Sequence, residues 1–218
     1  MLRIIGDVHG KYNEYLKIAS ESEYSLQVGD MGFDYEPLSP LDPSNHVFVG
    51  GNHDNYDEYY QTPHAITSFD GSKDYGSAVL GGVKVFFVRG GFSIDKQSRL
   101  RAMSWGGPPT YWFDEELKEN VFEKALEAYR AAKPDILITH ECPKMLTSLV
   151  GDDDILSRFG FDPATFMTLT SKYLQWMFEA HEPSQWFFGH YHRDWKYVVG
   201  KTKFTCLDEL GFVDLNIN

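Results

Sequence analysis

Two histidines, His190 and His192, stand one residue apart near the C-terminal end of the chain, directly after the apolar run Trp186–Phe188 and Gly189. The apolar run predicts a short buried strand, and the glycine allows the backbone to turn sharply where the strand ends. A surface histidine does not need a second one beside it. Because neutral imidazole is a common metal ligand, this pair predicts a metal site at the end of the strand.

Four other predicted strands end in the same way, with a glycine or threonine followed by a residue that can bind metal. The sequences at the five strand ends are GDVHG (6–10), GDMGF (29–33), GGNHD (50–54), TH (139–140) and GHYH (189–192). In an open α/β sheet, ligands bind beyond the carboxyl ends of the strands, so we expect the five ends to converge on one small volume. The candidate metal ligands are Asp7, His9, Asp30, Asn52, His140, His190 and His192.

This ligand set mixes imidazole nitrogen with carboxylate and amide oxygen, a mixture that suits borderline divalent ions. Seven ligands are too many for one tetrahedral ion and fit two ions if one carboxylate bridges them. The sequence therefore predicts a centre of two divalent metal ions, for which we expect Mn²⁺, with Fe²⁺, Ni²⁺ and Zn²⁺ as alternatives. Each histidine of the 190/192 pair would face a different ion, with Tyr191 pointing away.

The elements that must position these residues alternate along the chain. Short apolar runs predict strands at Leu2–Ile5, Tyr24–Val28, His46–Val49, Val83–Val88, Ile136–Thr139 and Trp186–Phe188. Helical patterns cover Lys11–Glu21, Asp114–Ala132 and Pro163–Ala180, the last with Asp162 as its expected N-cap. Hairpin turns are expected at Gly81-Gly82 and Gly200-Lys201. Strands separated by helices indicate an α/β protein.

Composition limits the class of protein. A chain of 218 residues is long enough for one domain with a substantial core, so we expect a single domain over residues 1–218. The hydrophobic fraction is 42% and no long apolar run is present, which predicts a globular protein outside the membrane. Two cysteines and the absence of a recognisable targeting segment favour a reducing, cytoplasmic location.

The chain is acidic, with a formal net charge of −12. We therefore expect no extended nucleic-acid surface, since proteins with such surfaces carry basic faces. A phosphate-handling site remains possible, because bound divalent metals can reverse the local potential of an acidic protein. The acidic run Asp152–Asp154 could suggest a further metal cluster, but three consecutive carboxylates cannot all face one ion, so we expect a solvated loop there.

The ordered motifs resemble those of the calcineurin-like metallophosphoesterases, whose series is GDxHG, GDxxD, GNH[DE], a lone His and GHxH. Here the series spans residues 6 to 192, nearly the whole chain. The resemblance implies a four-layer α/β/β/α sandwich, in which two mixed sheets are flanked by helices. It also implies a two-metal site on the loops at one end.

The resemblance further implies a role for each matched residue. One ion would be held by Asp7, His9, Asp30 and His192, with Asp30 bridging to a second ion held by Asn52, His140 and His190. His53 would be the proton donor or a hydrogen bonder to the transition state, and Asp54 would orient it or cap a short helix. The implied enzyme is a phosphatase or phosphodiesterase that uses a metal-bridging hydroxide on small phosphorylated molecules or nucleotides.

The second motif departs from the family pattern. Its last Asp is replaced by Phe33, with Asp34 one residue later. The Asp-Arg-Gly sequence and the Arg before GNH that hold phosphate in phosphoprotein Ser/Thr phosphatases are also missing. A place in that subfamily is therefore not expected.

Residues 90–105, GGFSIDKQSRLRAMSW, resemble the GGxxSxDKxxR segment of small bacterial and phage metallophosphoesterases. Lys96 and Arg99 in this segment could bind substrate phosphate, or Arg99 could pair with Asp95 instead. The stretch Trp105–Phe113 is rich in Gly, Pro and aromatic residues, and we expect it to form a loop that stacks on the organic group of the substrate.

Two alternatives to a small-molecule phosphoesterase remain. A non-catalytic scaffold of the same fold would have lost metal ligands, and none is missing here. A nuclease that works with partner subunits is disfavoured by the acidic balance and by the lack of a coiled-coil segment. The sequence does not indicate the physiological substrate or the oligomeric state.

Overall fold

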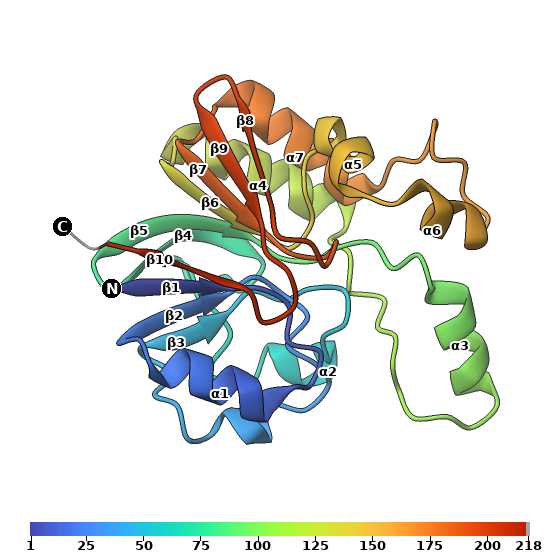
Figure 1. The fold of residues 1–218 in the computed structure, drawn as a ribbon, viewed down its shortest axis with the longest axis horizontal. Helices are drawn as coiled ribbons and strands as arrows, with labels where there is room; N and C mark the ends of the chain where they lie inside the picture. The colour runs from blue at the N-terminus through green and yellow to red at the C-terminus, as the bar shows by residue number, and fades with distance from the viewer. Residues whose placement is uncertain (217–218) are drawn as a thin grey trace.

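Two mixed sheets lie face to face in the computed structural model, which describes residues 1–216 (Figure 1). The first sheet has the order β10 (Phe212–Leu215), β1 (Leu2–Ile5), β2 (Tyr24–Gln27) and β3 (His46–Phe48). The second has the order β4 (Tyr75–Leu80), β5 (Val83–Val88), β6 (Ile136–Thr139), β7 (Gln185–Phe188), β9 (Thr202–Cys206) and β8 (Trp195–Val199). The strands of each sheet run parallel except at three edges, where β10, β4 and β8 pair antiparallel with their neighbours.

Helices cover the outer face of each sheet, which confirms the predicted four-layer sandwich (Figure 1). The first sheet is covered by α1 (Tyr12–Ser20), the 3-10 helix Glu36–Leu38 and α2 (Tyr56–Tyr59). The second is covered by α4 (Glu119–Ala132), α5 (Lys144–Val150) and α7 (Leu169–Ala180). Two further helices, α3 (Lys96–Ser104) and α6 (Asp153–Arg158), project from one side of the molecule. Within residues 1–216, every helix is too short or too polar to span a bilayer.

The alternation of side chains along the strands builds the three layers of core. Leu2 and Ile4 of β1 point between the sheets, where they belong to the same cluster as Phe87 and Ile138 of the second sheet. Ile5 belongs instead to the cluster beneath α1. Because successive side chains of a strand point to opposite faces, a strand of four apolar residues serves two core layers at once.

The six predicted strands agree with the structure to within one residue at each end. The hairpin turns at Gly81-Gly82 and Gly200-Lys201 are also confirmed. Both residues of the first turn have positive φ, 55° and 79°, as the tight connection of β4 to β5 requires. Asp152 accepts hydrogen bonds from the backbone N–H groups of Asp154 and Ile155, so the acidic run begins a helix rather than a loop.

Two helix starts were predicted wrongly. Residues 114–118 precede α4 as a loop, in which Glu115 is buried in a polar cluster. The last long helix begins at Leu169, because Thr168 and Ser171 form a capping box that satisfies the first free N–H groups. Asp162 accepts a hydrogen bond from the N–H of Ala164 and so only closes a local turn.

A buried arginine fixes the loop that leaves β5. Arg89 is 3% exposed, and its Nε donates to Asp74 Oδ1 over 2.6 Å. Its guanidinium also donates to the carbonyl of Asp114 and the hydroxyl of Tyr60, and it lies 4.5 Å from the ring centre of Tyr56. One cation therefore joins the end of β5 to α2 and to the loop before α4.

We predict that Arg89→Met lowers the free energy of unfolding by about 3 kcal/mol, because it leaves buried acceptors without a donor. Urea denaturation measures the change. The matched control is Arg101→Met on the exposed face of α3, which should change stability by less than about 0.5 kcal/mol. Equal effects of the two substitutions would contradict the structural role of Arg89.

Candidate metal centre

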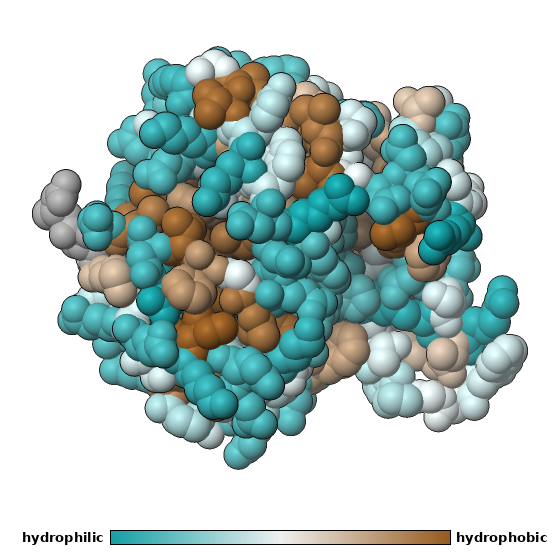
Figure 2. All heavy atoms as spheres, in the orientation of Figure 1, coloured by the Kyte–Doolittle hydropathy of each residue, from teal (hydrophilic) through white to brown (hydrophobic). Residues whose placement is uncertain are grey.

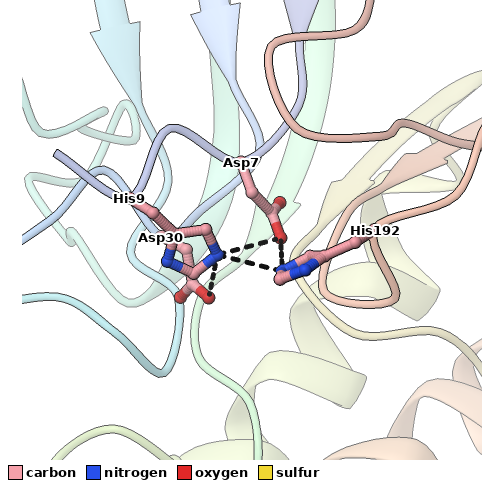
Figure 3. A group of neighbouring side chains, drawn as sticks. All are labelled: Asp7, His9, Asp30 and His192. Carbon is pink, nitrogen blue, oxygen red and sulfur yellow. Dashed lines mark hydrogen bonds and ion pairs between the residues drawn. The ribbon is translucent and has the colours of Figure 1, made fainter. Parts of the chain in front are cut away.

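The carboxyl ends of β1, β2, β3, β6 and β7 meet at one edge of the sandwich. Each is followed by the predicted candidates, and Figure 3 shows Asp7, His9, Asp30 and His192 directed toward one another. These four residues each offer a ligand atom, and the atoms lie within 4.8 Å of one another. They follow β1, β2 and β7 and form a candidate metal-binding group.

The first group of donors is tightly packed and partly unsatisfied. His192 Nε2 lies 2.9 Å from His9 Nε2 and 3.2 Å from Asp7 Oδ2. His9 Nε2 lies 3.6 Å from Asp30 Oδ2. Asp7 is fully buried, and its Oδ1 has no hydrogen-bond partner. A buried carboxylate oxygen without a donor, set among imidazole nitrogens, fits a divalent cation.

A second group of donors shares the Asp30 carboxylate. His140 Nε2 lies 3.2 Å from Asp30 Oδ1 and 3.0 Å from Asn52 Oδ1. His190 Nδ1 lies 2.8 Å from the same Asn52 oxygen. Asp30 therefore turns Oδ2 toward the first group and Oδ1 toward the second. The structure brings all seven predicted candidates into two adjoining sets of donors.

The ring of His140 is oriented by a hydrogen bond on its far side. Its Nδ1 lies 3.1 Å from the carbonyl oxygen of Val28, at the end of β2. A carbonyl can only accept, so Nδ1 carries a proton, and the ring is held with Nε2 facing Asp30 and Asn52.

Charge controls the protonation of Asp30. Burial by itself raises the pKa of its carboxyl, but the imidazoles of His140, His53 and His9 outweigh burial and hold the pKa well below its usual range. The carboxylate is therefore ionised at neutral pH and has two oxygens available to cations.

The backbone of the ligand loops adopts a conformation that L-residues avoid. Residues 1–216 include six non-glycine residues with positive φ, and four of them are candidate ligands: His9 (48°), Asp30 (60°), His190 (70°) and His192 (49°). Each such residue costs about 1–2 kcal/mol relative to the right-handed region. The fold thus holds these side chains in place against local preference, a pattern that clusters at functional sites.

The glycines beside the ligands permit close approach. A Cβ atom on Gly189 would overlap Asp7 Oδ1, and one on Gly51 would overlap Asp30 Oδ1 and lie 2.9 Å from His140 Nε2. Any larger residue at either position would push a ligand out of its group. The repeated glycine before a ligand, noted in the sequence, is therefore a packing requirement.

Asp54 does not orient His53 as the sequence comparison implied. Its buried carboxylate accepts hydrogen bonds from the backbone N–H groups of Asp30 (3.0 Å), Met31 (3.1 Å), Gly32 (3.2 Å) and Gly51 (2.6 Å). Its four backbone contacts therefore go to the loops that carry Asp30 and Asn52, and the hydroxyl of Tyr35 also donates to Oδ1 over 3.2 Å. Consecutive N–H groups converge on one carboxylate, and this interaction fixes both loops.

The carboxylate that approaches the imidazole nitrogen of His53 belongs to Asp95 instead, with Nε2 and Oδ2 4.0 Å apart. Asp95 stands at the start of α3, and its other oxygen, Oδ1, lies 3.5 Å from Arg99 Nη1, so the ion pair considered from the sequence is present. The ring of Phe33, which replaces the last Asp of the second motif, stacks on His53 with ring centroids 6.4 Å apart.

The predicted contact of Lys96 and Arg99 with substrate phosphate does not agree with their positions, because both side chains are engaged within the protein. Arg99 is 8% exposed, and its guanidinium pairs with Glu115 at 2.5 Å and donates to Ser93 Oγ at 2.8 Å. Ser93 in turn accepts a hydrogen bond from Asn52 Nδ2 over 3.0 Å. Arg99 thus helps to position the candidate ligand Asn52 through Ser93. Lys96 lies over the ring of Tyr111. These contacts do not agree with a direct phosphate contact by Arg99.

The stretch Trp105–Phe113 does not cover the site either. Trp105 is 81% and Phe113 77% exposed, and neither borders the cavity beside the donors. That cavity has a volume of about 330 Å³ and is bordered by His9, Asp30, Asn52, His53, His190 and His192. Its aromatic wall comes instead from Phe92, Phe159 and Phe166.

We predict that Asp54→Asn lowers the free energy of unfolding by about 2–3 kcal/mol, because the amide keeps one acceptor oxygen and turns an N–H group toward the backbone donors. Chemical denaturation measures the loss. Asp194→Asn, at an exposed position after the last ligand, is the control and should leave stability within about 0.5 kcal/mol. A variant of Asp54 as stable as the control would show that the carboxylate does not hold the loops.

Comparison with known proteins finds structures of similar fold. A search of curated proteins finds no match. A putative 5′-nucleotidase from Staphylococcus aureus, solved in complex with α-ketoglutarate, is 11% identical with a TM-score of 0.54, over 96% of this chain and 48% of that one. The chain thus spans about half the length of that structure. Phosphopantetheinyl hydrolase from Mycobacterium tuberculosis is 12% identical with a TM-score of 0.45, over 95% of this chain and 89% of that one.

Similarity at these identities concerns the fold alone. The family assignment comes from the sequence, because the model of the calcineurin-like phosphoesterases matches residues 2–194. That range contains every strand end that delivers a candidate ligand. The chain therefore belongs to the calcineurin-like phosphoesterase family.

Proposed function

We propose that the protein is a two-metal phosphoesterase that hydrolyses phosphomonoesters or phosphodiesters of small molecules. The observation that carries the proposal is Asp30, whose two carboxylate oxygens each face one set of nitrogen and oxygen donors. A non-catalytic scaffold is disfavoured, since each of the seven candidate ligand positions carries a residue that can bind metal. A nuclease subunit is disfavoured by the net charge of −12.

Two divalent ions would be held by the two sets of donors. Asp7, His9, Asp30 and His192 would bind one ion, and Asp30, Asn52, His140 and His190 the other. When bound, such ions neutralise the charge of a phosphoryl group and lower the pKa of water. Mn²⁺ is our proposed metal, because the mixed nitrogen and oxygen donors suit a borderline ion.

His53 is the residue that we propose acts on the leaving oxygen. Its side chain borders the cavity and is 29% exposed, so a substrate can reach it. Its backbone N–H donates to Asp30 Oδ1 over 2.7 Å, which places the ring beside both donor sets. Burial lowers the pKa of His53, while the charges of Asp30 and Asp95 favour the protonated ring. Asp95 would therefore assist proton donation by His53.

The proposal predicts that the protein binds two Mn²⁺ ions per chain and hydrolyses phosphate esters in their presence. Elemental analysis after desalting gives the ratio. Asp30→Asn keeps the shape but removes the charge between the two sets, so it should lose at least one ion and nearly all activity. One ion or fewer per chain at saturating Mn²⁺, or an Asp30→Asn variant within a few-fold of the natural protein, would contradict the proposal.

We predict that His53→Ala keeps both ions and slows turnover by about 10²–10⁴-fold on an alkyl ester, the range typical of general acid catalysis. With p-nitrophenyl phosphate the loss should be small, because p-nitrophenolate leaves without a proton. Steady-state rates on both esters, together with metal content, make the comparison.

Asp95→Asn is the companion variant for this experiment. If Asp95 assists His53, it should show a weaker form of the same dependence on the leaving group. Equal losses on both esters after His53→Ala would exclude proton donation and leave a role in binding the phosphoryl group. Loss of metal would make His53 a ligand.

A further inference from the structure

The cavity beside the donor sets has two unlike walls. One wall consists of the candidate ligands and His53. The opposite wall is apolar and is formed by Phe92, Ile94, Val150, Ile155, Leu156, Phe159 and Phe166. Figure 2 shows hydrophobic atoms, drawn brown, on the side of the molecule where α6 projects. A group attached to a phosphate bound at the donors would therefore lie against apolar side chains.

The apolar wall is assembled from segments between strands. Phe92 and Ile94 precede α3, Val150 ends α5, and α6 supplies Ile155 and Leu156. The rings of Phe92 and Phe166 have centroids 5.8 Å apart and pack with Phe161. Ile155 and Phe159 nevertheless remain 42% and 46% exposed. Apolar side chains gathered around a cavity and still exposed are typical of a ligand-binding surface.

Asp152, Thr147 and Glu141 in this wall are already paired within the protein, and the remaining carboxylate, Asp95, lies beside His53. Asp152 caps α6, and Thr147 Oγ1 donates to the carbonyl of Lys144. Glu141 accepts hydrogen bonds from Thr168 and from the N–H of Phe92. A nucleobase needs free donors and acceptors along its edge, and these residues offer none. The wall therefore favours an organic group without hydrogen-bonding functions.

Cations that could hold a second phosphate are also engaged elsewhere. Arg193 is the cationic residue bordering the cavity among the described residues, and its Nη2 lies 3.5 Å from Asp152 Oδ2. Arg99 is paired with Glu115, and Lys96 lies over Tyr111. A diphosphate, or a nucleotide with a further phosphate, would bring charge to an apolar wall without compensation.

We infer that the substrates are phosphate esters of apolar alcohols, with an alkyl or aryl group in the 330 Å³ cavity between α6 and the Phe92 loop. This inference rests on the proposed phosphoesterase function. The volume is at the lower end of pockets that bind small molecules, so a chain of medium length fits better than a two-chain lipid.

A series of n-alkyl phosphates from methyl to octyl, below the concentrations at which they form micelles, tests the inference on the Mn²⁺-loaded protein. We expect kcat/KM to rise about threefold for each added methylene until the cavity is filled. Thymidine 5′-phosphate should react no better than methyl phosphate. Calorimetric titration with the matching n-alkylphosphonates, which are not hydrolysed, should show the same rise in affinity.

Substitutions in the apolar wall show whether the increase in kcat/KM per methylene depends on it. Ile155→Gln and Phe159→Gln change half-exposed side chains of the wall, so they threaten folding little, and each should reduce the increase per methylene to less than half. Val198→Gln, a substitution of a 61% exposed side chain on β8, is the control and should leave the increase unchanged.

The outcomes separate the two ideas. Hydrolysis of all esters at equal rates, or a preference for the nucleotide, would overturn the apolar substrate class and leave the phosphoesterase function intact. Chain-length-dependent binding of the phosphonates without hydrolysis of any ester would overturn the proposed function and support the apolar site. Equal binding of methyl- and octylphosphonate would also overturn the inference.

Discussion

The carboxylate of Asp54 holds together the two loops on which the candidate centre depends. It accepts backbone hydrogen bonds from the loop after β2, which carries Asp30, and from Gly51 beside Asn52. These bonds compensate the left-handed conformation of Asp30, whose φ is 60°. Because Asp30 faces both sets of donors, its position determines the distance between them. A buried carboxyl group bonded mainly to backbone thus determines where the candidate ligands lie.

The second constraint is that the strand ends of the two facing sheets must lie at the same depth. Val28 and Ile138 lie in the shared core between the sheets, directly behind the donors. His140 of the second sheet donates to the carbonyl of Val28 in the first, so this bond joins the ligand loops of β2 and β6. Gly189 allows β7 to end against Asp7, since no side chain would fit between them. Apolar packing brings the strands together, and these polar contacts align their ends.

Much of this arrangement could be predicted from the sequence, because it follows from local patterns. Short apolar runs predicted the strands, and the polar residues that follow a glycine or threonine at their ends predicted the seven candidate donors. The contacts of Asp54, Asp95 and Arg99 could not be predicted, because each depends on a partner far away in the sequence. These partners are Glu115 for Arg99, Asp30 for Asp54 and His53 for Asp95, at separations of 16, 24 and 42 residues. The start of α7 was missed because Asp162-Pro163 imitates a helix start more strongly than Thr168 does.

The candidate metal ligands and the apolar residues of the cavity lie on different parts of the fold. The donors sit on strand ends, where backbone hydrogen bonds and sheet register leave little freedom. The apolar wall sits on the long connections from β5 to β6 and from β6 to β7, which carry α3, α5 and α6 outside the sheets. Such connections can change in sequence without disturbing the register of the strands. In this protein they bring phenylalanine, isoleucine and leucine to the cavity. Under the proposed function, the residues that select the substrate are therefore different from those that would act on its phosphate.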